Sequence, residues 1–533
     1  MTFRLPIFRL AAGSLTLFAA SCASVRPRLE HPHAQPVEAA LLSAKEAWRA
    51  LPAGNEATDA QRTQWRLALG GVLKTLEKQG PPGTWTGTQS IQGWTITFAG
   101  DTTGLQSVPP SWCDAIEPIT KIRPLPGIKG ERVAGDGVGL PVVMHQPRMA
   151  GTPDKYVPPN GRSYPATLTA EFTGDRAVTL TFHHTRNVRA AKVRGRSRAL
   201  AYDVSAAISA AMDVSFYSRY SLRGLIRPER YLGETSVYTP EPYDPKKIPV
   251  VLIHGIESAP HIWANVMNEM AADPLLRDRC QAWFFLYPTG MSIQGAAARL
   301  RATLTDARNH YDPRHRHAGM NRIALVGHSM GGLLSKMQIM DSGEDLYHSF
   351  WTKPLQELPI DKASRDMVQR TLYFKHLPFV KRAVFITTPH HGSKVVDISI
   401  LKAVFMLVKP ATAVAGLLKQ IAVAATSPVN PALRRFKTFG ARSNEGLSPE
   451  HPMLRAMAAR PLLARYDTIY AAFPPLSRNK PDNETTDGVV PYKSAWLPGA
   501  ESTTKISGFH TCIQSPALAE ALIPILRRHA GGK

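Results

Sequence analysis

The sequence predicts an α/β fold, a mostly parallel sheet with helices on both faces, preceded by a helical hairpin and a mainly β module. Two apolar runs, Ile248 to Ile253 and Ile323 to Val326, predict the sheet, because parallel strands buried on both faces are continuously apolar. The second run leads through a tight turn into a helix-compatible segment with Leu333, Leu334 and Met337. With 533 residues, of which 44% are hydrophobic, the chain can bury one large core or two separate ones.

The turn after the second run, Gly327 to Gly331, reads Gly-His-Ser-Met-Gly, a G-x-S-x-G pattern. Between a strand and a helix, this pattern is typical of a nucleophile elbow, which holds a serine in a strained conformation with its hydroxyl exposed. The pattern alone is weak in a chain with 38 glycines, and an ordinary strand-to-helix turn is the alternative. The preceding strand and the additional Gly332 favour Ser329 as a nucleophile.

A serine nucleophile needs a general base, usually histidine, and a carboxylate that orients the base. After a nucleophile elbow the carboxylate comes first along the chain and the histidine second. Asp487 follows a predicted strand, Tyr466 to Phe473, through a short polar loop. Asp467 opens that strand, and Asp482 and Glu484 lie in a Pro/Asn-rich loop. Asp487 is therefore the predicted acid, with an Asp-Gly turn residue as the alternative.

His510 is the predicted base. It follows the last predicted strand and precedes a final predicted helix, Ala517 to Arg528. The chain has 18 histidines, but beyond Asp487 the other one is His529, within that helix. A surface loop histidine is the alternative.

The reaction also needs backbone donors for the developing oxyanion. The amide of Met330, directly after the serine, is one candidate. The second is the amide of Ile256, in the loop after the apolar run that ends in His254-Gly255. We expect His254 to be structural in that turn. This mechanism requires neither a metal nor an organic cofactor.

Five motifs in this order resemble the α/β-hydrolase superfamily, in its lipase and serine esterase branch. They are His254-Gly255, Gly327 to Gly332, Thr388-Pro389-His390-His391-Gly392-Ser393, Asp487 to Pro491 and His510. The Thr388 to Ser393 segment, after a predicted strand Ala383 to Thr387, is similar to one in bacterial lipases and related serine esterases. The resemblance covers roughly residues 245–530. It implies an α/β-hydrolase fold in which Ser329, His510 and Asp487 cleave carboxylic esters through an acyl-enzyme.

Two insertions are predicted within residues 245–533, the catalytic domain: about 340–382 and about 394–465. The second contains an apolar stretch, Val395 to Ala425, interrupted by Lys402 and Lys409 and broken by Pro410, which argues against a membrane span. Such helices can form a lid over an acyl-binding cleft or lie at a membrane interface. Buried core helices are the alternative. A lid would favour an acyl or lipid substrate.

The first 22 residues predict export. Arg4 and Arg9 precede a short apolar stretch, Leu10 to Phe18, and small residues then lead to Cys22, as in a secretory signal. The final residues resemble a bacterial lipobox, which implies acylation of Cys22 and anchoring in the cell envelope. Ala23 at the next position favours the outer membrane. Ordinary cleavage that leaves Cys22 a free thiol is the alternative.

Residues 23–36 are interpreted as a tether, and residues 37–240 as an N-terminal accessory module. Two helices are expected within 37–79, the second opened by a capping box of Thr58 and Gln61. Strand-like runs follow, such as Trp85 to Phe98 and Ala166 to Phe182. The Pro-rich segment Thr239 to Pro245 is the predicted linker. An elaborate extension packed on the catalytic domain is the alternative.

Composition constrains the partners. Lys and Arg outnumber Asp and Glu by 64 to 41, a formal charge of +23 that favours anionic surfaces. The densest basic cluster, between Arg186 and Arg198, has no interleaved aromatic residues and no nucleic-acid module, so we expect no nucleic-acid partner. The remaining interpretations of the positive charge are a solvated basic face or binding to an anionic envelope surface. Cys113, Cys280 and Cys512 form no C-x-x-C motif, and an exported setting permits one disulfide among them.

These observations predict a serine hydrolase that acts on small-molecule or lipid esters. The same triad could serve acyl transfer, thioester cleavage or amide cleavage. A non-catalytic envelope-binding lipoprotein on the same fold is the alternative from another class, and it would be expected to lack a member of the triad.

Overall fold

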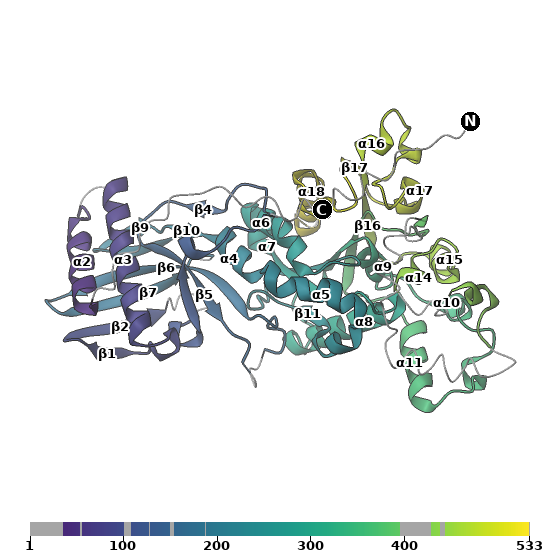
Figure 1. Cartoon of the computed structure of the whole chain (residues 1–533), viewed down its shortest axis with the longest axis horizontal. Coiled ribbons are helices and arrows are strands. Elements are labelled where there is room, and N and C mark those ends of the chain that lie inside the picture. The colour runs from purple at the N-terminus through teal and green to yellow at the C-terminus, as the bar shows by residue number, and fades with distance from the viewer. Residues whose placement is uncertain are drawn as a thin grey trace, which may run out of the picture.

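A computed structural model describes residues 36–53, 56–100, 108–126, 128–149, 154–186, 188–394, 428–436 and 443–531. Among these residues, the two largest sheets lie next to each other along the long axis of the molecule (Figure 1). A six-stranded sheet belongs to the N-terminal half of the chain and a seven-stranded sheet to the C-terminal half. We refer to them as the N-terminal sheet and the C-terminal sheet.

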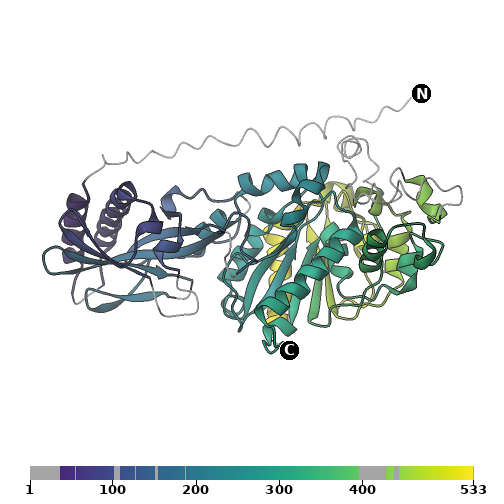
Figure 2. The same cartoon turned by 90° about the horizontal axis from the view of Figure 1, so that it is seen from below.

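Two helices, α2 (Val37–Ala50) and α3 (Asp59–Gln79), cover one face of the N-terminal sheet (Figure 2). Thr58 and Gln61 form both hydrogen bonds of a capping box at the start of α3. The buried face of α3, which includes Trp65 and Leu69, packs against the sheet in one apolar core. The order of the strands is β1-β2-β7-β6-β5-β3, and only β2 and β7 pair in parallel within the described sheet. The strands are β1 (Thr88–Ile91), β2 (Trp94–Gly100), β3 (Ala115–Pro118), β5 (Leu140–Gln146), β6 (Arg162–Thr173) and β7 (Ala177–His184).

The strand-like runs of the sequence are hairpins in the structure. Trp85 to Phe98 contains β1 and most of β2, and the chain turns between them at Gln92 and Gly93, which have positive φ. Ala166 to Phe182 contains parts of β6 and β7, which are joined by a short turn at residues 174–176. Two small sheets complete this half: β4 (Ala134–Gly135) with β10 (Tyr202–Asp203), and β8 (Ala190–Val193) with β9 (Arg196–Ala199).

The C-terminal sheet has the order β11-β13-β12-β14-β15-β16-β17, and all of its pairs are parallel except β11 with β13. Its strands are β11 (Ser236–Tyr238), β12 (Ile248–Ile253), β13 (Cys280–Leu286), β14 (Ile323–His328), β15 (Val380–Ile386), β16 (Arg465–Ala472) and β17 (Thr503–Ser507). The mixed sheet with helices agrees with the predicted α/β class.

Both faces of the C-terminal sheet are buried, which explains the continuous apolar runs. In β12, Val251 and Ile253 face one core, and Val250 and Leu252 face the other. Helices α8 (Ile293–Tyr311), α9 (Met330–Lys336) and α11 (Lys362–Leu372) contribute to the first core. The second core includes side chains of α6 (Ala264–Ala272), α7 (Pro274–Arg279) and α18 (Pro516–Gly531).

The C-terminal unit begins earlier in the chain than the predicted linker. Strand β11 lies before Thr239, yet it pairs with β13 at the edge of the C-terminal sheet. Helices α4 (Val204–Ala211) and α5 (Val214–Ile226) also contribute side chains to the second core. A three-residue edge strand has too little periodicity to be recognised from sequence, so the boundary near residue 240 lies inside the packed unit.

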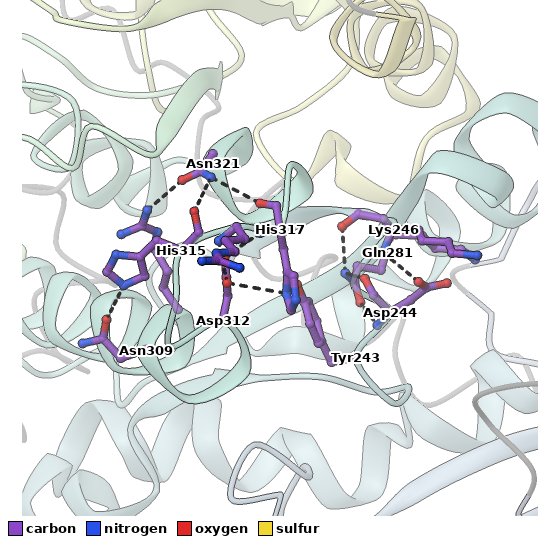
Figure 3. Close-up of polar contacts among 12 residues, drawn as sticks. Tyr243, Asp244, Lys246, Gln281, Asn309, Asp312, His315, His317 and Asn321 are labelled. Atoms are coloured by element: carbon purple, nitrogen blue, oxygen red, sulfur yellow. Dashed lines mark hydrogen bonds and ion pairs between the residues drawn. The ribbon is translucent and has the colours of Figure 1, made fainter.

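The end of the predicted linker and the residues directly after it are held by polar contacts near the start of β12 (Figure 3). The amide of Asp244 donates to the side chain of Gln281 at 3.1 Å, and Gln281 Nε2 donates to the carbonyl oxygens of Asp244 and Lys247. The Tyr243 hydroxyl lies 3.0 Å from His317 Nδ1. These contacts set the position at which β12 enters the sheet.

Residues 337–379 connect α9 to β15 and include α10 (Gly343–His348) and α11. Strand β15 begins at Val380, earlier than predicted, because Lys381 and Arg382 hide its start in the sequence. Residues 428–436 and 443–464 include α14 (Ser443–Gly446) and α15 (Pro452–Ala458).

Several predictions lie outside the described residues: the export signal with Cys22, nearly all of the tether, and the apolar stretch proposed as a lid. In the parts of the chain that are described, no helix combines the length and apolarity needed to span a membrane. Cys113, Cys280 and Cys512 are buried free thiols.

Candidate active site

Ser329 lies in the turn between β14 and α9, with φ 53° and ψ −123°. Two glycines allow this turn. A Cβ on Gly327 would lie 2.5 Å from the carbonyl oxygen of Gly331, and a Cβ on Gly331 would lie 2.3 Å from the carbonyl oxygen of Ile253. Any larger residue would therefore force the backbone apart. The amide of Ser329 donates to the carbonyl oxygen of Ile386 at 2.9 Å, which ties the turn to the end of β15.

His510 and Asp487 meet Ser329 at the carboxyl edge of the C-terminal sheet, the edge at which its parallel strands end. His510 Nε2 lies 2.9 Å from Ser329 Oγ, and its Nδ1 lies 2.7 Å from Asp487 Oδ2. An ionised carboxylate only accepts hydrogen bonds, so Nδ1 donates to Asp487 and Nε2 is free to accept the serine proton. The structure thus brings together the three residues that the sequence singled out. In the chain, Asp487 lies 158 residues after Ser329, and His510 lies 23 residues after Asp487.

Asp487 is held in a fixed orientation. Its second oxygen, Oδ1, accepts the amides of Val489 at 2.8 Å and Val490 at 2.6 Å. The carboxyl group is buried, and its backbone carbonyl accepts the amide of His510 at 3.0 Å. The loop therefore presents Oδ2 to the imidazole. The competing carboxylates lie elsewhere: Asp467 pairs with Arg382 inside β16, and Asp482 pairs with Lys505 at 2.7 Å.

The two predicted oxyanion donors belong to the residue after the serine and to the loop that approaches the serine. Met330 begins α9, and Ile256 follows Gly255, at which an added Cβ would lie 3.0 Å from Ser329 Cβ. Neither amide has a hydrogen-bond acceptor among the described residues. Ser329 is only 4% exposed, less than the sequence predicted for a nucleophile elbow, but two free amides near its hydroxyl are what an oxyanion hole requires. No group of three or more metal-binding side chains gathers within the described parts of the chain.

Comparison with solved structures finds lipases and carboxylesterases. A mature lipase of Bacillus licheniformis, BlEst2, is 19% identical, with 55% of this chain and 97% of that chain covered and a TM-score of 0.30. For a metagenomic carboxyl esterase, MGS0156, the identity is 17%, the coverages are 54% and 77%, and the TM-score is 0.27. A Staphylococcus hyicus lipase is 14% identical, with 55% of this chain and 98% of that chain covered and a TM-score of 0.32. No protein-family model and no curated protein sequence matches the chain.

At these identities and TM-scores the solved structures say nothing about the reaction or substrate of this chain. The strand order, the elbow at Ser329 and the hydrogen bonds of His510 are properties of this chain itself.

The Thr388 to Ser393 segment, which the resemblance singled out, holds the loop that carries Asp487. The amide of His390 donates to the carbonyl oxygen of Ser494 at 2.9 Å. The Ser494 hydroxyl donates to the carbonyl oxygen of Gly392 at 2.6 Å and accepts the amide of His391 at 3.2 Å. The Ser393 hydroxyl donates to the carbonyl oxygen of Val489. Sequence reasoning missed Ser494, because no local pattern marks a serine 102 residues from its partner.

Three buried histidines surround the site as neutral groups. Burial lowers the pKa of His254 to about 3, and burial together with the nearby His510 lowers that of His328 well below its usual value. Burial, with the nearby Lys336 charge, does the same for His390. His254 stacks on Tyr287 in its turn, which fits the structural role expected for it. His328, missed by sequence reasoning, donates from Nε2 to the carbonyl oxygen of His510 at 3.0 Å and so positions the base.

Proposed function

We propose that the protein is a serine hydrolase that cleaves carboxylic esters. The observation that carries this proposal is the continuous hydrogen-bonded chain from Ser329 Oγ through His510 to Asp487, built on a positive-φ elbow beside two free amides. A surface loop histidine without a catalytic role would not need a carboxylate on one nitrogen and the serine of a positive-φ turn on the other.

In the proposed reaction, Ser329 Oγ attacks the ester carbonyl carbon while His510 Nε2 accepts the hydroxyl proton. The amides of Met330 and Ile256 stabilise the oxyanion that forms. His510 then protonates the departing alcohol, leaving an acyl group on Ser329. Water attacks this acyl-enzyme with His510 again as base, and the carboxylic acid leaves. Asp487 keeps the imidazole in the tautomer that can accept at Nε2.

The test is labelling of the purified full chain by a fluorophosphonate probe, followed by hydrolysis of p-nitrophenyl esters with short and long acyl chains. Ser329→Ala should abolish labelling. Ser335→Ala is the matched control, because this buried serine of α9 only donates to the carbonyl oxygen of Gly331 and should still permit labelling of Ser329. Absence of labelling in folded wild-type protein, with detergent present, would contradict the proposal.

We further propose an acyl or lipid ester as the substrate and attachment to the bacterial envelope through an acylated Cys22. The apolar composition of residues 395–425 and the lipobox-like end of the export signal support these two proposals. Metabolic labelling with a radioactive fatty acid should mark the wild-type protein and not Cys22→Ser. Added alcohol acceptors in the ester assay would reveal acyl transfer, the main alternative reaction, as a new ester product.

A further inference from the structure

A cavity of about 870 Å³ opens at the amino edge of the C-terminal sheet, the edge at which its parallel strands begin. Arg322 precedes β14, Arg382 lies near the start of β15, and Arg465 is the first residue of β16. Ser329 lies at the opposite end of β14, so the six residues of this strand separate the two places by about 20 Å. The cavity is therefore distinct from the candidate active site.

The cationic side chains of this cavity outnumber the carboxylates that pair with them. They include five cationic side chains, those of Arg322, Lys381, Arg382, Arg465 and Arg528. Two carboxylates pair with three of the arginines. Asp467 contacts Arg382 and Arg528, and Glu501 contacts Arg382 at 2.6 Å and Arg465 at 3.3 Å. Five positive and two negative charges leave a local excess of three.

Two of the cations lack a carboxylate partner. Neither Lys381 nor Arg322 forms an ion pair among the described residues, and Lys381 is exposed at the cavity. Arg382 itself is 2% exposed, and its Nε has no hydrogen-bond partner. A buried N–H without an acceptor is costly, so the two carboxylates do not satisfy Arg382 completely.

Part of the cavity lining is apolar. Leu462 and Leu463 belong to it together with Ala464 and Tyr466, and Leu463 is 47% exposed. Cationic side chains and an apolar part of the lining together suit a ligand in which an anionic group is attached to an organic part. The volume is far larger than a single inorganic anion needs.

We propose that this cavity binds a phosphate-bearing ligand, with the phosphate at Arg322, Lys381 and Arg465 and its organic part against Leu462 and Leu463. Arginine and lysine are the side chains that proteins use for phosphate, and a group with one or two negative charges fits the excess of three. The ligand is either the headgroup of an anionic phospholipid or a soluble phosphate ester, because both present the same chemistry. The proposal does not depend on the esterase activity.

The test compares two double variants with the wild-type full chain. Lys381→Gln with Arg465→Gln removes two exposed cations of the cavity. Lys192→Gln with Arg370→Gln removes two exposed cations that do not line it, with the same change in net charge. Near-ultraviolet circular dichroism and thermal unfolding verify that each variant folds. Calorimetric titration with glycerol 3-phosphate probes a soluble ester, and co-sedimentation with phosphatidylcholine vesicles, with and without phosphatidylglycerol, probes a headgroup.

Binding of glycerol 3-phosphate that weakens at least tenfold in the cavity variant alone would identify a soluble ester. More sedimentation with vesicles that contain phosphatidylglycerol than with vesicles that lack it, a difference lost in the cavity variant alone, would identify a headgroup. An anchor at Cys22 would contribute equally to both vesicle types. Equal losses in the two double variants would mean that net charge alone attracts anions and would overturn the proposal. Binding of neither probe by the wild-type protein would overturn it as well.

Discussion

The two edges of the C-terminal sheet are built from the same strands but by different means. At the carboxyl edge, three non-glycine residues directly after or near the ends of β12, β14 and β15 have positive φ: Glu257, Ser329 and Thr387. The histidines there are mostly buried and neutral. At the amino edge, arginines and carboxylates form an ion-pair network around an open cavity.

The difference shows how one sheet can separate two tasks. Strained backbone is tolerated where the packed strands over-determine it, and such strain is typical of catalytic sites. The ion pairs are concentrated at the other edge, so the carboxylate that pairs with His510 is Asp487 rather than a member of that network. We therefore expect changes at the carboxyl edge to act mainly on the reaction, and changes at the amino edge to act mainly on stability.

The largest expected effect is that of Asp487→Asn. The amide cannot hold His510 in the required tautomer, so kcat for ester hydrolysis should fall about 10⁴-fold while the fold is kept. Asp482→Asn is the matched control, since this exposed carboxylate pairs only with Lys505 among the ion pairs of that loop, and kcat should stay within a few-fold. Similar losses in both variants would mean that the loop as a whole, rather than Asp487, supports the reaction.

Next in size is Arg382→Met at the amino edge. The substitution leaves the buried carboxylate of Asp467 with Arg528 as its remaining ion-pair partner among the described residues. Removing one partner of a buried pair costs about 3–5 kcal/mol, which urea denaturation can measure. Lys362→Met, which breaks an exposed pair with Asp366, should cost less than about 1 kcal/mol. A cost for Arg382→Met as small as that of the control would mean that the network does not stabilise this edge.

Gly327→Ala should lower both activity and stability. The new Cβ would lie 2.5 Å from the carbonyl oxygen of Gly331, and only a backbone shift can relieve this contact. Overpacking of this kind costs about 1–3 kcal/mol, and the shift displaces Ser329. Gly71→Ala in α3 is the control, because its Cβ meets nothing within 4 Å, and it should raise stability by about 0.5–1 kcal/mol. An active, fully stable Gly327→Ala enzyme would contradict the role of this glycine.

The smallest expected effect is a change in the pH dependence of stability in His529→Gln. Burial, reinforced by the charges of Arg382 and Arg322, lowers the pKa of His529 to about 4 in the folded protein. In the unfolded chain this histidine is protonated below pH of about 6.5, whereas in the folded protein it stays neutral down to about 4. Protonation therefore favours the unfolded state, and the histidine makes folding less favourable as pH falls from about 6.5 towards 4.

Glutamine can still donate to the carbonyl oxygen of Arg322, the acceptor of His529 Nε2. Between pH 7 and 5 the free energy of unfolding should therefore fall by about 2 kcal/mol less in the variant than in the wild type. Equal pH dependence in His529→Gln and wild type would show that His529 is not held neutral by its surroundings.

The sequence was sufficient where a feature depends on neighbours along the chain. The uninterrupted apolar run predicted β12 (Ile248–Ile253) and where it starts, because burial of both faces leaves no polar positions, although the predicted strand also included His254 and Gly255. The elbow at Ser329 and the capping box at Thr58 were visible because each is completed within a few residues. Chain order then led to Asp487 and His510, which the structure brings into hydrogen-bond contact with the serine relay.

Tertiary structure alone decided features made by residues far apart in the chain. The pairing of β11 with β13, the hold of Ser494 on the Asp487 loop, and the gathering of Arg322, Arg382 and Arg528 around one cavity have no local signature. Hydrophobic periodicity reports which face of an element is buried but not which strand ends lie next to one another. Strand order sets those neighbours, and with them the distribution of strain and charge between the two edges of the sheet.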